Sequence, residues 1–116
     1  MSLAANIGVA TALPDLLREQ RNGAIISADG IYRYLLWRTT RVDDDEIVLF
    51  IGANPSTADA ITDDPTIRRC VGFAKQWGYG HMLMANLFAW RATNPRDVPF
   101  DPMHACGPEN DKWLHA

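Results

Sequence analysis

Two apolar runs, separated by an amphipathic segment, dominate the hydrophobic pattern of the chain. Residues 47–51 are isoleucine, valine, leucine and phenylalanine, a composition typical of a strand buried on both faces. Residues 81–90 form a second apolar strand, which Asn86 interrupts. Between the two runs, apolar residues recur at helical spacing as far as Trp77. Because a strand–helix–strand unit has a right-handed crossover, the two strands are predicted to be parallel.

The helix between these strands has recognisable ends. Asp64 suits the N-cap position and Pro65 the first helical position. The Gly-Tyr-Gly segment at residues 78–80 is expected to terminate the helix after Trp77. The apolar stripe predicted to face the sheet consists of Ile67, Cys70, Val71, Ala74 and Trp77. We therefore expect Cys70 to fill the core rather than to act as a nucleophile.

The segment before the first apolar run is predicted to be a β-hairpin. A short strand at residues 24–27 and a longer one at residues 31–39 flank Asp29-Gly30, a strong two-residue turn signal. On or near the longer strand lie Arg33, Arg38 and Arg41. We interpret these arginines as solvated charges at a sheet edge, where charge discourages aggregation. Phosphate binding is the alternative interpretation.

The remaining segments carry weaker patterns. Residues 1–23 read as an extension in which residues 15–21 form a short packing helix. The acidic residues 43–46 are expected to form a solvated loop, and the proline-rich residues 91–102 another. A last helix is predicted to start near Pro108, with Trp113 and Leu114 packing on the domain. The pattern as a whole predicts a single α/β domain, a small three-layer structure with a parallel strand–helix–strand core and an N-terminal hairpin.

Composition removes several classes of function. The 116 residues are 47% hydrophobic and 22% charged, with a formal net charge of -3, so a strongly basic nucleic-acid footprint is absent. The two cysteines and three histidines have no metal-ligand spacing, and neither a metal nor another cofactor is expected. The sequence has no apolar run approaching the ~20 residues that span a bilayer. A reduced, cytoplasmic protein without a membrane partner is the expectation.

Candidate chemistry follows the two apolar strands. Gly52 ends the first strand, and a polar loop comes next, at the position where α/β proteins place binding groups. Asn86 interrupts the second strand, and two readings of it stay open: a structural amide bonded to loop backbone, or a ligand-reading amide. The candidate binding residues are Gly52, Pro55, Ser56, Thr57, Asp59, Asn86, Arg68, Arg69 and Arg91, and the candidate catalytic residue is Asn54.

Several motifs resemble a known family of bacterial and phage proteins. These are YRYLLWR, FIGANPSTADAITDDPTIRRCVGFAKQWGYG, NLFAWRATNP and GPENDKWL, which together cover about residues 27–114. They are similar to the family catalogued as domain of unknown function 1643 (DUF1643), and residues 24–116 would form the family domain. This resemblance implies a family without implying a reaction.

A more distant resemblance points to a chemistry. The segment VLFIGANP is similar to the strand-and-loop motif of uracil-DNA glycosylases, particularly the mismatch-specific branch. In that family the motif asparagine positions the attacking water, a role that would fall on Asn54. A second asparagine reads the flipped base, a role that would fall on Asn86. The resemblance therefore implies a nucleobase-processing enzyme that acts on nucleic acid or a nucleotide.

The chain departs from the glycosylase pattern in two places. Ser56 replaces the last glycine of the loop motif, and no His-Pro-Ser type segment occurs near the end of the sequence. The family domain is expected to be truncated at its C-terminus or naturally short. A missing C-terminal strand would leave an unpaired sheet edge and favour a homodimer or another partner. Three hypotheses stay open: an N-glycosidic hydrolase, a non-catalytic nucleotide- or phosphate-binding module assisted by Arg68 and Arg69, and a structural protein.

Overall fold

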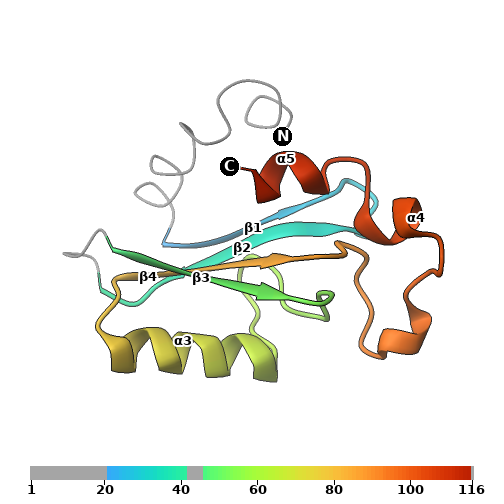
Figure 1. Ribbon diagram of the computed structural model, residues 1–116. Helices are drawn as coiled ribbons and strands as arrows, with labels where there is room; N and C mark the ends of the chain where they lie inside the picture. Colours follow the sequence, from blue (N-terminus) through green and yellow to red (C-terminus); the bar gives the residue numbers. More distant parts are fainter. Residues whose placement is uncertain (1–20, 42–45, 116) are drawn as a thin grey trace.

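The computed structural model describes residues 21–41 and 46–115. Its centre is a four-stranded sheet with the strand order β1-β2-β4-β3 (Figure 1). The strands are β1 (Asn22–Ile26), β2 (Arg33–Thr39), β3 (Ile47–Gly52) and β4 (His81–Asn86). β2 is antiparallel to β1 and β4, whereas β3 and β4 are parallel. The predicted α/β class is confirmed, but the sheet is mixed and its parallel part is a single pair.

The predicted hairpin is confirmed by the pairing of β1 with β2. Gly30 lies in the turn with a φ of 77°, a left-handed conformation that favours glycine. The pairing register shifts near the turn: Ile25 faces Leu35 but Ile26 faces Arg33, so Tyr34 is an extra residue in β2. Such a β-bulge turns the side chains beyond it to the other face of the sheet. Arg33 therefore lies on the face of Leu36 rather than that of Leu35.

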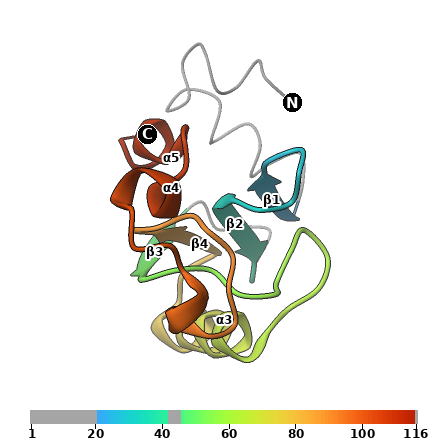
Figure 2. The ribbon, with the colours of Figure 1, turned by 90° about the vertical axis from the view of Figure 1, so that its right-hand side faces the viewer.

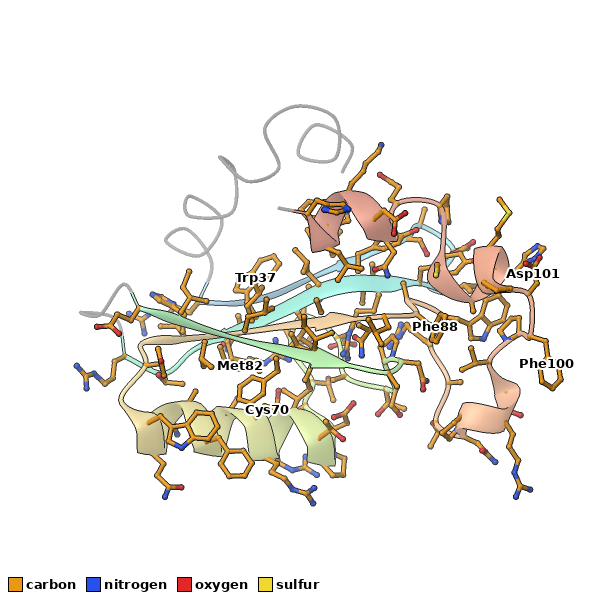
Figure 3. The ribbon with its side chains drawn as sticks, viewed as in Figure 1. Trp37, Cys70, Met82, Phe88, Phe100 and Asp101 are labelled. Carbon is orange, nitrogen blue, oxygen red and sulfur yellow. The ribbon has the colours of Figure 1, made fainter. Side chains whose placement is uncertain are left out.

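Helix α3 (Pro65–Trp77) connects β3 to β4 and lies along one face of the sheet, with its predicted caps in place. Asp64 accepts a hydrogen bond from the backbone nitrogen of Ile67 at 2.9 Å. Gly78 ends the helix with a φ of 82°. In Figure 3, Met82 of β4 and Cys70 of α3 lie between sheet and helix, and the two belong to one buried cluster.

The predicted apolar stripe of α3 is correct except at its last residue. Ile67, Cys70 and Ala74 are buried, whereas Trp77 is 54% exposed. Its ring stacks on Phe50 of β3, with 6.0 Å between the ring centroids. It also stacks on Phe73 of the same helix, with 5.2 Å between the ring centroids, so Trp77 packs beside the outer strand rather than in the core. Cys70 is confirmed as a core residue, and burial raises the pKa of its thiol.

The other face of the sheet carries a second buried cluster. Its members come from three strands, the segment after β4 and the C-terminal helix, namely Ile25, Tyr34, Leu35, Trp37, Ala85, Ala89 and Trp113. Figure 2 shows α5 (Asn110–Leu114) and α3 on opposite sides of the sheet. The prediction that Trp113 and Leu114 pack on the domain is confirmed. The helices on this side, α5 and its neighbour α4, are five residues each, which is short for a complete helical layer. The three-layer architecture therefore stays a prediction.

Two predictions about burial are wrong. β3 is not buried on both faces: Ile47, Leu49 and Ile51 are 40%, 52% and 57% exposed, because α5, on the face opposite α3, packs mainly on β2 and β4. Conversely, Arg33 and Arg38 are not solvated edge charges, since they are only 2% and 5% exposed on an inner strand. Arg41, beyond the end of β2, is exposed.

The C-terminal part of the described chain contains more helix than predicted. A 3₁₀ turn, η1 (Pro95–Asp97), and helix α4 (Pro102–Cys106) follow β4. Asp101 caps α4 by accepting a hydrogen bond from the nitrogen of Met103 at 3.1 Å. Within the described ranges, every helix is too short or too polar to cross a membrane. The short helix predicted at residues 15–21 and the acidic loop at 43–46 fall almost entirely outside the described residues.

Candidate functional site

A cavity of about 250 Å³ opens where β3 and β4 end and α3 begins. The elements around it come together because the loops after the two parallel strands stay paired. Backbone nitrogens of Leu87 and Phe88 donate to the carbonyls of Gly52 and Ala53, both at 2.9 Å. The cavity is lined by Arg33, Gly52, Ala53, Asn54, Pro55, Ser56, Asp64, Thr66, Ile67, Met84 and Asn86. The loop predicted from the sequence therefore forms one wall of this cavity.

Gly52 is required by close packing rather than by backbone strain. A Cβ atom at this position would lie 2.8 Å from Nδ2 of Asn86 and 3.8 Å from Sδ of Met84. The first distance is shorter than a van der Waals contact. The absence of a side chain at Gly52 thus leaves the space in which the Asn86 amide sits.

The amide of Asn54 is oriented by the main chain. Its Nδ2 donates to the carbonyl oxygens of Pro55 at 3.1 Å and Ala92 at 3.0 Å. Both N–H groups are thereby used, and Oδ1 has no donor among the described residues. Asn54 is half-buried in the cavity wall, so it can offer a fixed acceptor to a water or a ligand.

Asn86 lies at the end of β4 and is 3% exposed. Its Oδ1 accepts from Nη2 of Arg33 at 3.4 Å, while Nδ2 has no acceptor within the described part of the chain. The backbone behind it is held by Asn110, whose Nδ2 donates to the carbonyls of Asn86 and Leu87 at 3.0 and 3.1 Å. Asn110 is fully buried and positions this end of β4, a role that the sequence analysis did not find.

Arg33 contributes a buried positive charge. Its Nη1 donates to the carbonyl oxygen of Ala58 at 3.2 Å, and its Nε is buried with no acceptor among the described residues. Burial lowers the pKa of Arg33 to about 10, an effect that the negative charge of Asp64 opposes. The guanidinium therefore stays protonated near neutral pH. A charged residue inside a run of β-forming residues was the available sequence signal.

Asp64 is a structural carboxylate at the floor of the same cavity. Its Oδ1 accepts from the nitrogen of Ile67, and its Oδ2 accepts from the nitrogen of Ala58 at 3.1 Å. With both oxygens bonded to the main chain and 5% of the residue exposed, Asp64 fixes the helix start and loop. It is poorly placed to take a proton from water.

The other candidate residues lie away from the cavity. Arg68 and Arg69 are exposed on α3, and Arg68 donates to the carbonyl of Asp63 at 3.4 Å. Asp59 accepts from the nitrogens of Ile61 and Thr62, at 3.0 and 2.8 Å, and so shapes the loop. The described residues contain no group of three metal-ligating side chains placed to hold an ion.

Arg91 and Thr57 line a second, open hollow of about 330 Å³ next to the cavity. Arg91 donates to the carbonyls of Ser56, Gly30 and Thr57, at 3.2, 3.2 and 3.1 Å, and so joins two loops. Ser56 lines both hollows, and its Oγ lies 3.4 Å from the hydroxyl of Thr93. The candidate residues thus divide between a partly enclosed cavity at the ends of β3 and β4 and a more open hollow that contains Arg91.

Comparison with known proteins gives one match. No curated protein and no solved structure gives a significant match to the chain, so these two comparisons do not support the resemblance to glycosylases. The profile of a family described as protein of unknown function (DUF1643) matches residues 33–116. That match includes β2 and all of the residues that line the cavity. The chain therefore belongs to the DUF1643 family.

Proposed function

We propose that the cavity binds a nucleobase and that the protein hydrolyses an N-glycosidic bond. The observation that carries this proposal is the convergence of two carboxamides. Asn54 and Asn86 follow adjacent parallel strands and line the same cavity. They offer complementary free groups, an acceptor on Asn54 and donors on Asn86. A planar ring with oxo and N–H groups along its edge requires this combination.

The size of the cavity supports a ligand of one ring. Pockets for drug-sized ligands measure about 300–1,000 Å³, and this cavity is slightly smaller. A base would fill it, while the attached sugar would lie at the mouth, where Thr66 is exposed. A base within a duplex would have to be extruded to enter.

In the proposed reaction, Oδ1 of Asn54 holds a water against the anomeric carbon of the sugar. The water oxygen bonds to that carbon, and the bond from the carbon to the ring nitrogen breaks with its electron pair leaving on the base. One water proton ends on the base or in solvent. Because a carboxamide cannot deprotonate water, rate enhancement would come from positioning and from stabilising the departing base.

A non-catalytic nucleotide-binding module is the second candidate. The observation that favours it is the open hollow beside the cavity, where Arg91 lies among the hydroxyls of Ser56, Thr57 and Thr93. A nucleotide with its base in the cavity could place a phosphate there, because Ser56 lines both spaces. In this reading the protein binds the nucleotide without turning it over.

The test is the release of free base. Wild-type protein is incubated with nucleosides and with single-stranded oligonucleotides carrying uracil or damaged bases, and released base is measured by chromatography. We expect release by the wild type, none by Asn54→Ala, and unchanged release by Asn94→Ala, which alters an exposed asparagine outside the cavity. If the wild type releases no base from any substrate, the catalytic proposal is wrong.

A melting experiment distinguishes the non-catalytic nucleotide-binding module from the enzyme. A binding module should show a ligand-dependent rise in melting temperature with nucleotides but no turnover. We expect Asn86→Ala to remove the rise, because it deletes the donors inside the cavity. Arg91→Gln should reduce the rise for nucleotides but not for nucleosides, because only the nucleotide carries a phosphate.

A further inference from the structure

Two arginines of β2 differ in how their charges are compensated. Arg38 is 5% exposed, and its Nε contacts Oδ1 of Asp63 at 2.8 Å. Arg33 is 2% exposed, and no carboxylate of the described residues lies within 4.0 Å of its guanidinium. A buried charge is unfavourable unless it is paired. The same strand thus holds one paired and one unpaired buried cation.

The nearest acid does not supply the missing partner. Asp64 lines the cavity with Arg33, but both of its oxygens accept hydrogen bonds from backbone nitrogens. Among the described residues, the acceptors of Arg33 are neutral: the backbone carbonyl of Ala58 and the side-chain carbonyl of Asn86. Its Nε–H is buried and has no acceptor in the described chain. Arg33 therefore places a positive charge beside the cavity, together with a buried N–H that no described group satisfies.

Apart from Asp64, the neighbouring groups add hydrogen-bond donors rather than negative charge. Nδ2 of Asn86 is without an acceptor among residues 21–41 and 46–115, and the hydroxyl of Thr66 lines the same space. The bulge at Tyr34 is what turns Arg33 toward these groups. Bulges that redirect a side chain are common beside binding sites. We propose that the cavity binds its ligand through an anionic oxygen that contacts Arg33.

If the ligand is a nucleobase, the anionic-oxygen site rests on the proposed function and extends it. A base that leaves a sugar with the electron pair of the broken bond carries negative charge on its ring nitrogen, delocalised onto its exocyclic carbonyl oxygens. Arg33 would stabilise that charge, whereas a neutral base would leave the guanidinium without an anionic hydrogen-bond partner. A small oxyanion such as phosphate has the same chemistry without a ring, and the two sources can be told apart by experiment.

The experiment is calorimetric titration of the full chain with three probes near neutral pH. Uracil is neutral under these conditions, 5-nitrouracil is largely ionised, and inorganic phosphate is an anion without a ring. We expect the wild type to bind 5-nitrouracil at least about tenfold more tightly than uracil, because an ion pair between the guanidinium and an anionic oxygen replaces a hydrogen bond to a neutral carbonyl oxygen. In Arg33→Gln the preference should fall to less than about twofold.

Two further variants separate the effect of Arg33 from folding and from net charge. Asn86→Asp places a carboxylate oxygen where Oδ1 now lies, 3.4 Å from Nη2 of Arg33. Asn86→Asp should abolish the preference for the anion while Arg33 is still present. This variant therefore tests the role of Arg33 even if Arg33→Gln does not fold. Arg69→Gln makes the same charge change on the exposed face of α3 and should leave the preference unchanged.

Each outcome decides between the two proposals. If the rings do not bind but phosphate binds and depends on Arg33, the anionic-oxygen site stands and the nucleobase proposal fails. If uracil and 5-nitrouracil bind equally, the nucleobase proposal stands and the anionic-oxygen site is refuted. Equal loss of preference in Arg69→Gln and Arg33→Gln also refutes it, because bulk charge would then suffice. Absence of binding for all three probes overturns both proposals.

Discussion

The substitution Gly52→Ala tests how tightly the end of β3 packs against the end of β4. The added Cβ would lie 2.8 Å from Nδ2 of Asn86, and this amide cannot simply move away because its Oδ1 accepts from Arg33. Overpacking of this kind costs about 1–3 kcal/mol. Replacing glycine by alanine returns about 0.4–1 kcal/mol through the unfolded chain, because Gly52 has no positive φ to forbid the change.

The net expectation for Gly52→Ala is a loss of about 1–2 kcal/mol in the free energy of unfolding. For a domain of this size, roughly 4 °C in melting temperature accompanies each kcal/mol. The assay is urea denaturation together with thermal unfolding. Ligand binding should fall more than stability does, since the displaced amide belongs to the proposed site.

Gly72→Ala is the matched control for this substitution. Gly72 lies in the middle of α3, and a Cβ there would have no heavy atom within 4 Å. We expect it to stabilise the protein by about 0.5–1 kcal/mol, the usual gain when alanine replaces glycine in a helix. If Gly52→Ala matches or exceeds the wild type in both stability and binding, the argument from packing at β3 and β4 is refuted.

Other positions give independent tests of the fold. Asp64→Ala removes the acceptor for two backbone nitrogens and should lower the free energy of unfolding by about 2–4 kcal/mol in urea denaturation; a loss below 0.5 kcal/mol would contradict the assigned bonds. Asn110→Ala leaves the carbonyls of Asn86 and Leu87 without their donor, so we expect a loss of about 1–3 kcal/mol and faster hydrogen exchange around residues 86–88. Hydrogen bonds from the nitrogens of Ile61 and Thr62 lower the pKa of Asp59 below 3.8. Its stabilising contribution is therefore complete above pH 3.8 and lost as the pH falls through the lower folded value, which an NMR titration of Asp59 against Asp59→Asn stability curves would check.

The arginines of β2 show why burial is hard to infer from a strand sequence. Charges on a strand of an isolated hairpin are expected to be solvated, and Arg33 and Arg38 were interpreted in this way. In the folded chain β4 pairs with the side of β2 that β1 does not cover, with Leu36 opposite Met84. β2 is therefore an inner strand of the sheet and not an edge strand. The antiparallel register also places the start of β2 beside the end of β4, which brings Arg33 to Asn86.

What the sequence determined by itself is the set of elements whose signals are local. The hairpin turn at Asp29-Gly30, the capped helix from Pro65 to Trp77 and the parallel pairing of β3 with β4 were all predicted from neighbouring residues. So was the position of the polar loop after Gly52. The turn, the helix and the loop depend on backbone conformation and hydrogen bonding over a few residues, and the amino-acid types that favour them are read directly. The parallel pairing of β3 with β4 joins distant residues, but it follows from the handedness of a strand–helix–strand connection.

What only the tertiary structure decided is the order of the strands and the composition of the cavity. Strand order depends on how much apolar surface each arrangement buries when the whole chain folds. That buried surface is a sum over residues far apart in the sequence. The strand order left β3 exposed on one face and buried β2. The bulge at Tyr34 also decides the position of Arg33. One unpaired residue reverses the face of the sheet on which the next side chain lies, and the local amino-acid pattern does not reveal it.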